Sequence, residues 1–203
     1  MNSAQTLKAL RTDPDFIHLQ GLPGVLIDLK YASVDNFMAR NVYGEFNEAF
    51  LHKVAAEKLQ KAVSHLKSER PDWKFLVLDA LRPRSIQRVL WDHVAGTDQE
   101  DYVANPDKGS VHNYGLAVDL TCVDEAGEWV NMGSGFDYFH RISQPRFEEE
   151  FLRTGELKRE HWENRQVLRR AMTKAGFLQL PHEWWHFDAL PREEIRSGFR
   201  LIE

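Results

Sequence analysis

The feature that most constrains the fold of this chain is a short polar cluster set among aromatic residues. The segment 181–188 reads PHEWWHFD and holds two histidines and two carboxylates beside two tryptophans and a phenylalanine. Solvated loops seldom combine these residue types, and a carboxylate buried among apolar groups is costly unless it is paired or bound to a metal. Two imidazoles and a carboxylate that leave one coordination position open make a zinc hydrolase site. This segment is therefore a first candidate for chemistry.

A second segment, 109–119, holds the same kinds of groups and reads GSVHNYGLAVD. His112 precedes Asp119 by seven residues, and Gly115 between them suits a tight turn or a close approach to another group. The pattern over 116–123 predicts a strand on which Asp119 is flanked by apolar residues. Such a carboxylate is either a metal ligand or a hydrogen-bonded Asp beside a satisfied core histidine. The segment alone leaves both interpretations open.

A third cluster, LDALRPR at 78–84, follows an apolar stretch that is typical of a strand. Arg82 comes after that stretch, and Pro83 fixes the turn behind it. An arginine at a strand end can place a rigid fork of donors into a cleft. Taken in isolation, an arginine paired with a surface aspartate is the more common interpretation.

The letters HExxH run from His182 to His186, a pattern that on a helix binds zinc through both histidines and uses the glutamate as base. The preceding proline and the two tryptophans favour an extended segment instead. The longer metzincin pattern needs Gly at 189 and His at 192, where this chain has Ala189 and Arg192. Only 17 residues follow His186 in this 203-residue chain, which leaves little room for the downstream glutamate ligand of other zincins. The alternative is that His186 is a ligand, Glu183 is the base and His182 is neither.

The remaining pattern indicates helices and strands that alternate irregularly. No helix–strand repeat suggests a Rossmann fold or a TIM barrel, so we expect one α+β domain over residues 1–203, with a mainly antiparallel central sheet flanked by helices. The expected strands are 25–31, 74–80 and 116–123, with a further extended, aromatic stretch over 177–190. The expected helices are 47–68, 85–95 and 158–175, with Asn47 and Ser85 as the caps of the first two and Gly96 beyond the end of the second. A polar loop is expected over 97–110 and turns over 124–135.

Composition excludes several classes of protein. The chain is 42% hydrophobic and 28% charged, which is close to the average of globular domains. Its longest apolar runs are a few residues, so we expect no membrane span, and its net charge of −5 argues against a nucleic-acid partner. The single cysteine, Cys122, can form no intrachain disulfide. With no expected secretory signal, these features favour the cytoplasm.

Together these segments resemble the zinc D-Ala-D-Ala peptidases of the VanX type. The pattern Ser-x-His-x-x-Gly-x-Ala-x-Asp runs from Ser110 to Asp119, and Glu-x-Trp-His runs from Glu183 to His186. The similarity also covers DAxRP at 79–83, DLKYA at 28–32, DNF at 35–37, MG at 132–133 and FD at 136–137. These matches follow the family's order from residue 28 to residue 188. The resemblance implies the zinc fold that D,D-peptidases, VanY-type carboxypeptidases and Hedgehog proteins share.

The resemblance also implies a site. It implies one zinc per chain, bound by His112, Asp119 and His186. It implies that Glu183 is the catalytic base for a metal-activated water. The implied zinc site keeps one position open for that water.

The resemblance further implies how a substrate is held. Arg82 is expected to face the scissile carbonyl. Tyr31 and Asp137 are expected at the free amino end of the substrate, and Ser110 at its carboxylate end. His182, Asp188 and His140 match no functional position, so we interpret them as structural or as neighbours of the ligands.

The expected activity is hydrolysis of D-alanyl-D-alanine, or a close D,D-dipeptide, to free amino acids. One alternative is a D,D- or L,D-carboxypeptidase that trims peptidoglycan stem peptides, which lie outside the cytoplasm. A second is a non-catalytic, zinc-stabilised binding module. Glu183 argues against that module, because a structural zinc site needs no base and is usually closed by four ligands. The expected partner is a small dipeptide, with no nucleic acid and no membrane, and the oligomeric state stays open.

Overall fold

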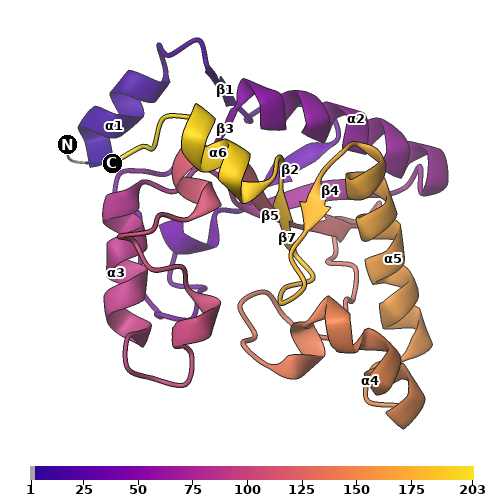
Figure 1. Ribbon diagram of the computed structural model, residues 1–203. Coiled ribbons are helices and arrows are strands. Elements are labelled where there is room, and N and C mark those ends of the chain that lie inside the picture. The colour runs from indigo at the N-terminus through magenta and orange to yellow at the C-terminus, as the bar shows by residue number, and fades with distance from the viewer. Residues whose placement is uncertain (1–2) are drawn as a thin grey trace.

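A five-stranded sheet lies at the centre of the computed structural model, which describes residues 3–203 (Figure 1). The strand order is β2-β4-β5-β7-β6. β2 runs parallel to β4, and each of the other neighbouring pairs is antiparallel. The expected α+β class with a mainly antiparallel sheet is therefore confirmed. The strands are β2 (Val25–Ile27), β4 (Lys74–Asp79), β5 (Ala117–Val123), β6 (Leu178–Gln179) and β7 (His186–Asp188).

Helices surround this sheet. The two longest, α2 and α5, pack against each other along one side of it, and α3 lies across the view from them (Figure 1). β1 (Phe16–His18) and β3 (Phe50–His52) form a separate antiparallel pair. The helices are α1 (Ser3–Leu10), α2 (Lys53–Glu69), α3 (Arg84–Val94), α4 (Glu148–Thr154), α5 (Arg159–Lys174) and α6 (Arg192–Gly198). Short 3₁₀ turns are η1 (Lys30–Ala32), η2 (Glu100–Tyr102), η3 (Val111–Tyr114), η4 (Arg141–Ser143) and η5 (Pro145–Phe147).

The hydrophobic core lies around β5 and the inner face of α2. β5 is buried at every position, so its polar members Asp119 and Thr121 lie inside the protein. The helical periodicity of α2 is confirmed, because the residues of one stripe are buried: Ala55, Ala56, Leu59, Ala62, Val63 and Leu66. Cys122 is also fully buried on β5, as expected. Within residues 3–203, no helix is long and apolar enough to cross a membrane.

The predicted start of the second helix was wrong. The sequence suggested Asn47 as its cap, whereas residues 50–52 form β3 and the helix begins at Lys53. His52 caps α2, since its ring accepts a hydrogen bond from the Val54 N–H. β3 pairs with β1, a distant segment, and that pairing overrides the local helical preference.

Other predicted boundaries also shifted. The strand expected over 25–31 ends at Ile27, and Tyr31 lies in η1, where its carbonyl accepts the N–H groups of Val42 and Tyr43. Ser85 does not cap α3, since Pro83 occupies that position. Gly96 does follow the end of α3, with a φ of +78°. The sequence did not predict α1, β1, α4 or α6.

Candidate active site

Strand register brings two of the predicted metal ligands side by side. Asp119 on β5 lies opposite His186 on β7, and on its other side it lies opposite Asp79 on β4. His112 comes from η3, which leads into β5 through Gly115. Gly115 has a φ of +66°, and a Cβ there would lie 2.9 Å from the backbone nitrogen of His52. Glycine therefore allows the tight turn that brings His112 back over the strand.

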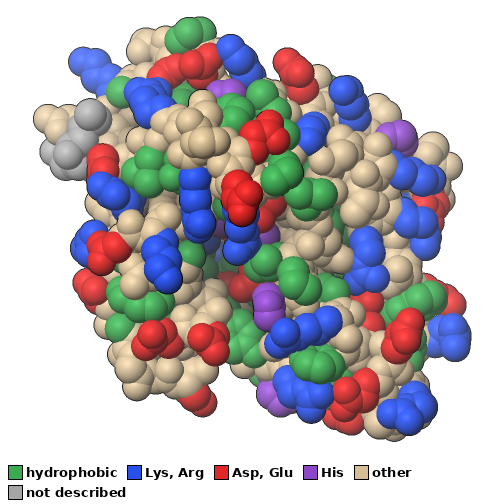
Figure 2. Space-filling view, in the orientation of Figure 1, with side chains coloured by type: hydrophobic (Ala, Val, Ile, Leu, Met, Phe, Trp, Pro, Cys, Tyr) green, Lys and Arg blue, Asp and Glu red, His purple; other side chains and the backbone are tan. Residues whose placement is uncertain are grey.

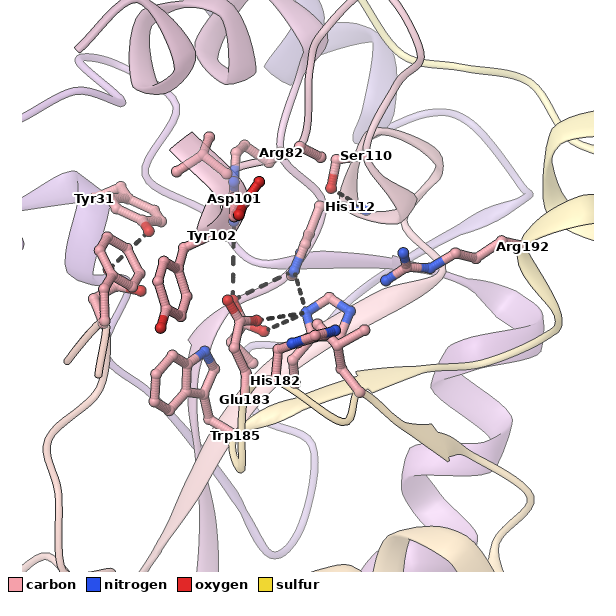
Figure 3. Close-up of a pocket in the computed structure, with 17 residues that line it drawn as sticks. Tyr31, Arg82, Asp101, Tyr102, Ser110, His112, His182, Glu183, Trp185 and Arg192 are labelled. Atoms are coloured by element: carbon pink, nitrogen blue, oxygen red, sulfur yellow. Dashed lines mark hydrogen bonds and ion pairs between the residues drawn. The ribbon is translucent and has the colours of Figure 1, made fainter. Parts of the chain in front are cut away.

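The ligand atoms of these three residues all lie within 4.8 Å of one another (Figure 3). His112 Nε2 lies 3.2 Å from His186 Nδ1 and 3.3 Å from Asp119 Oδ2, and His186 Nδ1 lies 2.9 Å from Asp119 Oδ1. Ligands held tetrahedrally at about 2.0–2.1 Å from a zinc ion lie about 3.3 Å apart. The spacing of the donors therefore fits a single small metal ion.

The opposite nitrogen of each imidazole has its own partner. His112 Nδ1 lies 2.6 Å from the Ala80 carbonyl, and His186 Nε2 lies 2.7 Å from Asp188 Oδ1. Protons on these two nitrogens leave His112 Nε2 and His186 Nδ1 with lone pairs that face Asp119. The donor set and its supporting contacts together fit a metal.

In the metal-free protein, the charges of the buried histidines and carboxylates balance one another. Burial lowers the pKa of His186, but Asp188 and Asp119 outweigh that effect and raise it well above its usual value. Burial would raise the pKa of Asp119, but the two histidines hold it well below its usual range. A metal ion would take the place of these protons as the positive charge beside Asp119.

Glu183 lies beside this group without joining it. Its carboxylate is 3.9 Å from His186 Nδ1, and its side chain is buried. Burial raises the pKa of Glu183 to about 7, against the lowering effect of His186. A carboxyl group that titrates near neutral pH can both accept and return a proton, as a general base does.

Arg82 is fixed by buried partners. Its Nε and Nη2 donate to Asp79 Oδ2 at 2.8 and 2.6 Å, and its Nη1 donates to Gln87 Oε1 at 2.8 Å. Asp79 is fully buried and also accepts the Tyr43 hydroxyl. The surface ion pair considered from the sequence is therefore wrong. The guanidinium lines the same cavity as the metal group, with Nη2 3.9 Å from Asp119 Oδ2.

Tyr31 and Asp137 lie together on one side of the cavity. The Tyr31 hydroxyl donates to Asp137 Oδ2 at 2.8 Å, across 106 positions of sequence. Burial raises the pKa of Asp137 well above its usual value, although the Tyr31 hydrogen bond lowers it. Asp137 also has a φ of +54°, a strained conformation for a non-glycine residue. It thus lies in a turn and also presents its carboxyl group to the cavity.

Ser110 lies elsewhere on the cavity wall, at the start of η3. Its Oγ accepts a hydrogen bond from the His112 N–H at 3.4 Å, and its own N–H donates to Asn113 Oδ1 at 2.7 Å. These bonds form a capping box that fixes His112. The Ser110 hydroxyl proton is left to face the cavity.

All eight predicted site residues line one cavity of about 270 Å³. Figure 2 shows a hollow near the middle of this face, with basic, acidic and histidine side chains at its edge. The sequence did not assign the other wall residues to the site, and the polar ones among them include Asp101, Tyr102, His182 and Arg192. Asp101 and Tyr102 come from a loop that carried no recognisable motif.

The helical HExxH alternative is wrong. Residues 181–185 form turns and bends, and His186 begins β7. His182 is exposed at the cavity wall and does not belong to the group of metal-binding donors found within residues 3–203. The extended segment expected from the proline and tryptophans is confirmed in its strand portion.

Comparison with known proteins identifies the family. Residues 15–198 match the peptidase family described as D-ala-D-ala dipeptidase. This chain belongs to that family. Three proteins named D-alanyl-D-alanine dipeptidase are similar to it. The Escherichia coli protein is 33% identical over 82% of this chain and 79% of its own length. The Enterococcus faecalis protein is 30% identical over 82% and 86%, and the Synechocystis protein 29% over 64% and 65%.

Membership of the D-Ala-D-Ala dipeptidase family makes this chain a peptidase, and so a hydrolase. The match runs from before Tyr31 to beyond Arg192 and thus includes every wall residue of the cavity. The family and the His112, Asp119 and His186 group agree on a metal-dependent enzyme.

Proposed function

We propose that this chain hydrolyses D-alanyl-D-alanine, or a close D,D-dipeptide, to free amino acids with one zinc ion per chain. One observation carries the proposal. A buried group of two histidines and an aspartate shares a small cavity with a glutamate whose pKa is raised to about 7. That combination is what metal-assisted hydrolysis of a peptide bond requires.

His112, Asp119 and His186 would hold the zinc. Bound there, zinc would polarise the substrate carbonyl and activate a water for attack. Glu183 takes the proton from the attacking water and passes it to the amine that leaves. No side chain needs to form a covalent bond with the substrate, so Ser110 is not a nucleophile in this scheme.

Arg82 faces the carbonyl oxygen that becomes negative during attack. Asp79 and Gln87 hold its guanidinium in place before the substrate arrives, so little reorganisation is needed at the moment of reaction. Removal of one such donor typically slows a reaction by about 10² to 10³. Because this contact strengthens only as charge develops, its loss is expected in kcat more than in KM.

Tyr31 and Asp137 bind the free ammonium group of the dipeptide. The pKa of Asp137 is raised because desolvation and the charges of Asp119 and Glu183 outweigh the lowering effects of Tyr31 and Arg82. An ammonium group supplies positive charge there and forms a charge-assisted hydrogen bond. Ser110 donates its hydroxyl proton at the carboxylate end. These contacts favour a dipeptidase over a carboxypeptidase, whose longer substrates offer a neutral amide to Asp137.

The wider setting follows from the same proposal. We infer that the chain is one domain, which is supported by the single core cluster that hydrophobic residues from Leu7 to Ile202 share. D-Ala-D-Ala is a cell-wall building block, which links the activity to peptidoglycan. A cytoplasmic location stays a prediction, supported by the single buried cysteine.

An amino-acid release assay tests the proposed function. Zinc-loaded protein is incubated with D-Ala-D-Ala and, separately, with L-Ala-L-Ala, and free alanine is measured. We expect release from the D,D-dipeptide, loss of release on chelation, and recovery when zinc is restored. Glu183→Ala should bind zinc yet lose a factor of about 10² to 10⁴ in rate. No release from D-Ala-D-Ala by zinc-loaded wild-type protein would refute the proposal.

A further inference from the structure

An arginine from the last helix reaches the cavity, although no sequence motif pointed to it. Arg192 is the first residue of α6, and its side chain lines the cavity wall. Its Nε donates to Asp188 Oδ2 at 3.0 Å. The other oxygen of Asp188 lies 2.7 Å from His186 Nε2. One carboxylate thus holds both a metal-ligating histidine and this arginine.

The ion pair between Arg192 and Asp188 leaves part of the guanidinium free to bind a ligand. A guanidinium carries five N–H donors, and among the residues that the structure describes only the Nε–H of Arg192 is engaged, with Asp188. The Arg192 side chain is 48% exposed, whereas that of Asp188 is 8% exposed. The buried Asp188 therefore fixes the Nε end of the guanidinium, while its two Nη atoms remain accessible to a ligand.

The place of Arg192 in the cavity indicates which part of the substrate it can bind. In Figure 3, Tyr31 lies on one side of His112, and Arg192 lies on the opposite side and points toward the cavity. Ser110, which belongs to the carboxylate end of the proposed substrate, lies on the same side of Tyr31 as Arg192 does in this view. A dipeptide zwitterion carries its ammonium and its carboxylate on opposite sides of the scissile bond. Asp137 accepts the Tyr31 hydroxyl and so lies at the Tyr31 side of the cavity, opposite Arg192, which repeats that order of charges.

The charge around Arg192 supports the assignment. Burial lowers the pKa of His182, and the positive charges of Arg146 and Arg192 lower it further. Asp101, on the opposing loop, acts in the other sense on His182. The nearest carboxylate, Asp188, is already shared with His186.

We propose that Arg192, oriented by Asp188, binds the terminal carboxylate of the dipeptide and makes the enzyme select substrates that end in a free carboxylate. The inference rests on the proposed function and adds a specificity residue to it. An arginine fork matches a carboxylate geometrically, and hydrogen bonds between charged groups are the stronger kind.

Comparison of two substrates tests this role. Steady-state kinetics of zinc-loaded wild-type and Arg192→Met protein are measured with D-Ala-D-Ala and with D-Ala-D-alaninamide, which lacks the terminal charge. We expect Arg192→Met to raise KM for D-Ala-D-Ala about 10- to 100-fold and to change KM for the amide less than threefold. Arg192→Lys should recover part of the loss. Arg196→Met, an exposed change on the same helix, serves as the matched control and should leave both substrates unaffected.

A binding measurement separates this inference from the proposed function. Titration calorimetry with D-Ala-D-Ala compares zinc-loaded Glu183→Ala with Glu183→Ala/Arg192→Met, and we expect the second to bind about 10- to 100-fold more weakly. Zinc content and thermal unfolding are recorded for each protein, and Arg192→Gln replaces Arg192→Met if the latter does not fold. Equal losses for dipeptide and amide, or an unchanged Kd, would overturn the role of Arg192. Failure of wild-type protein to hydrolyse either substrate would instead overturn the proposed function.

Discussion

At the scale of single residues, the site contains two carboxyl groups that lower the stability of the folded protein. Glu183 is a carboxyl group buried among aromatic residues, and burial raises its pKa to about 7. Asp137 is half-buried, has a strained backbone with a positive φ, and likewise has a raised pKa. Such unfavourable groups concentrate where a protein binds or reacts. These two carboxyl groups are therefore better explained by catalysis and substrate binding than by stability.

The first prediction concerns the stability of the metal-free protein. The pKa of Glu183 is about 7 in the folded chain, against an ordinary value of 4.5, so the folded state holds this proton more tightly. Its stabilising effect is complete below pH 4.5 and is lost as pH rises through 7. Glu183→Gln cannot lose a proton, so relative to wild type it should gain up to about 3 kcal/mol between pH 5 and pH 8.

Urea unfolding of the metal-free wild-type and variant proteins at both pH values measures this gain. Glu163→Gln, on α5, is the control and should give the same difference at both pH values. If the wild-type protein and Glu183→Gln differ equally at pH 5 and pH 8, then Glu183 does not have a raised pKa in the folded state.

The second prediction separates the two histidines of the HExxH letters. His186 points Nδ1 at Asp119 and Nε2 at Asp188, whereas His182 is exposed at the cavity wall. His186→Ala should therefore lose most of its zinc, and His182→Ala should keep it. Metal analysis after dialysis measures both. Equal zinc loss from the two variants would refute the ligand assignment.

At the scale of elements, the register of the sheet brings the metal-binding residues together. The pattern of the sequence alone does not reveal that register. Periodicity predicted β5 and α5 to within a residue or two, because each buries a long apolar face. The β1–β3 pair escaped prediction, because its strands are three residues each and are stabilised by a distant partner. The resemblance identified His112, Asp119 and His186, but only the pairing of β5 with β7 explains why Asp119 and His186 meet.

Arg192 shows the limit of motif reasoning in the site. In the sequence it drew notice only as a residue that stands where a metzincin has histidine. Its place in the cavity depends on the turn between β7 and α6 and on Asp188, which the sequence reasoning treated as structural. The spacing of four residues between Asp188 and Arg192 is visible in the sequence, but the direction in which the guanidinium points is not.

The third prediction concerns how α5 supports the segment that carries Asp137. Arg165 is buried, and its guanidinium donates to the carbonyls of Met132 and Ile142 at 2.7 and 2.9 Å and to the Ser134 hydroxyl at 3.1 Å. Arg165→Leu leaves these acceptors without a donor, so it should lower the free energy of unfolding by about 3 kcal/mol or more. It should also raise the KM for D-Ala-D-Ala, because the turn at Asp137 loses its support.

Arg170→Leu on the same helix is the matched control. Arg170 is exposed and pairs with Glu69 on α2, so its removal should cost less than about 1 kcal/mol and leave KM unchanged. Urea unfolding and hydrogen exchange over 131–144 distinguish the two variants. Equal stability losses, or an exchange rate over 131–144 that Arg165→Leu does not increase, would show that Arg165 does not hold this segment.

At the scale of the whole molecule, the cavity draws its walls from nearly the full length of the described chain. Its lining begins at Tyr31 in η1 and ends at Arg192 in α6, with the metal group from η3, β5 and β7 between them. The small volume and the opposite charges at its ends fit a short zwitterion better than a long peptide. The central claim is therefore that the enzyme requires a free ammonium group next to the scissile bond.

The rate of hydrolysis of D-Ala-D-Ala relative to acetyl-D-Ala-D-Ala tests that claim most directly. With the acetylated substrate, Asp137 faces a neutral amide in place of the ammonium group, a loss of roughly 3 to 5 kcal/mol by analogy with broken buried ion pairs. We predict that zinc-loaded wild-type protein prefers the free dipeptide by about 10² to 10³ in kcat/KM, and that Asp137→Asn narrows the gap. Equal rates on the two substrates would contradict the account and favour a carboxypeptidase.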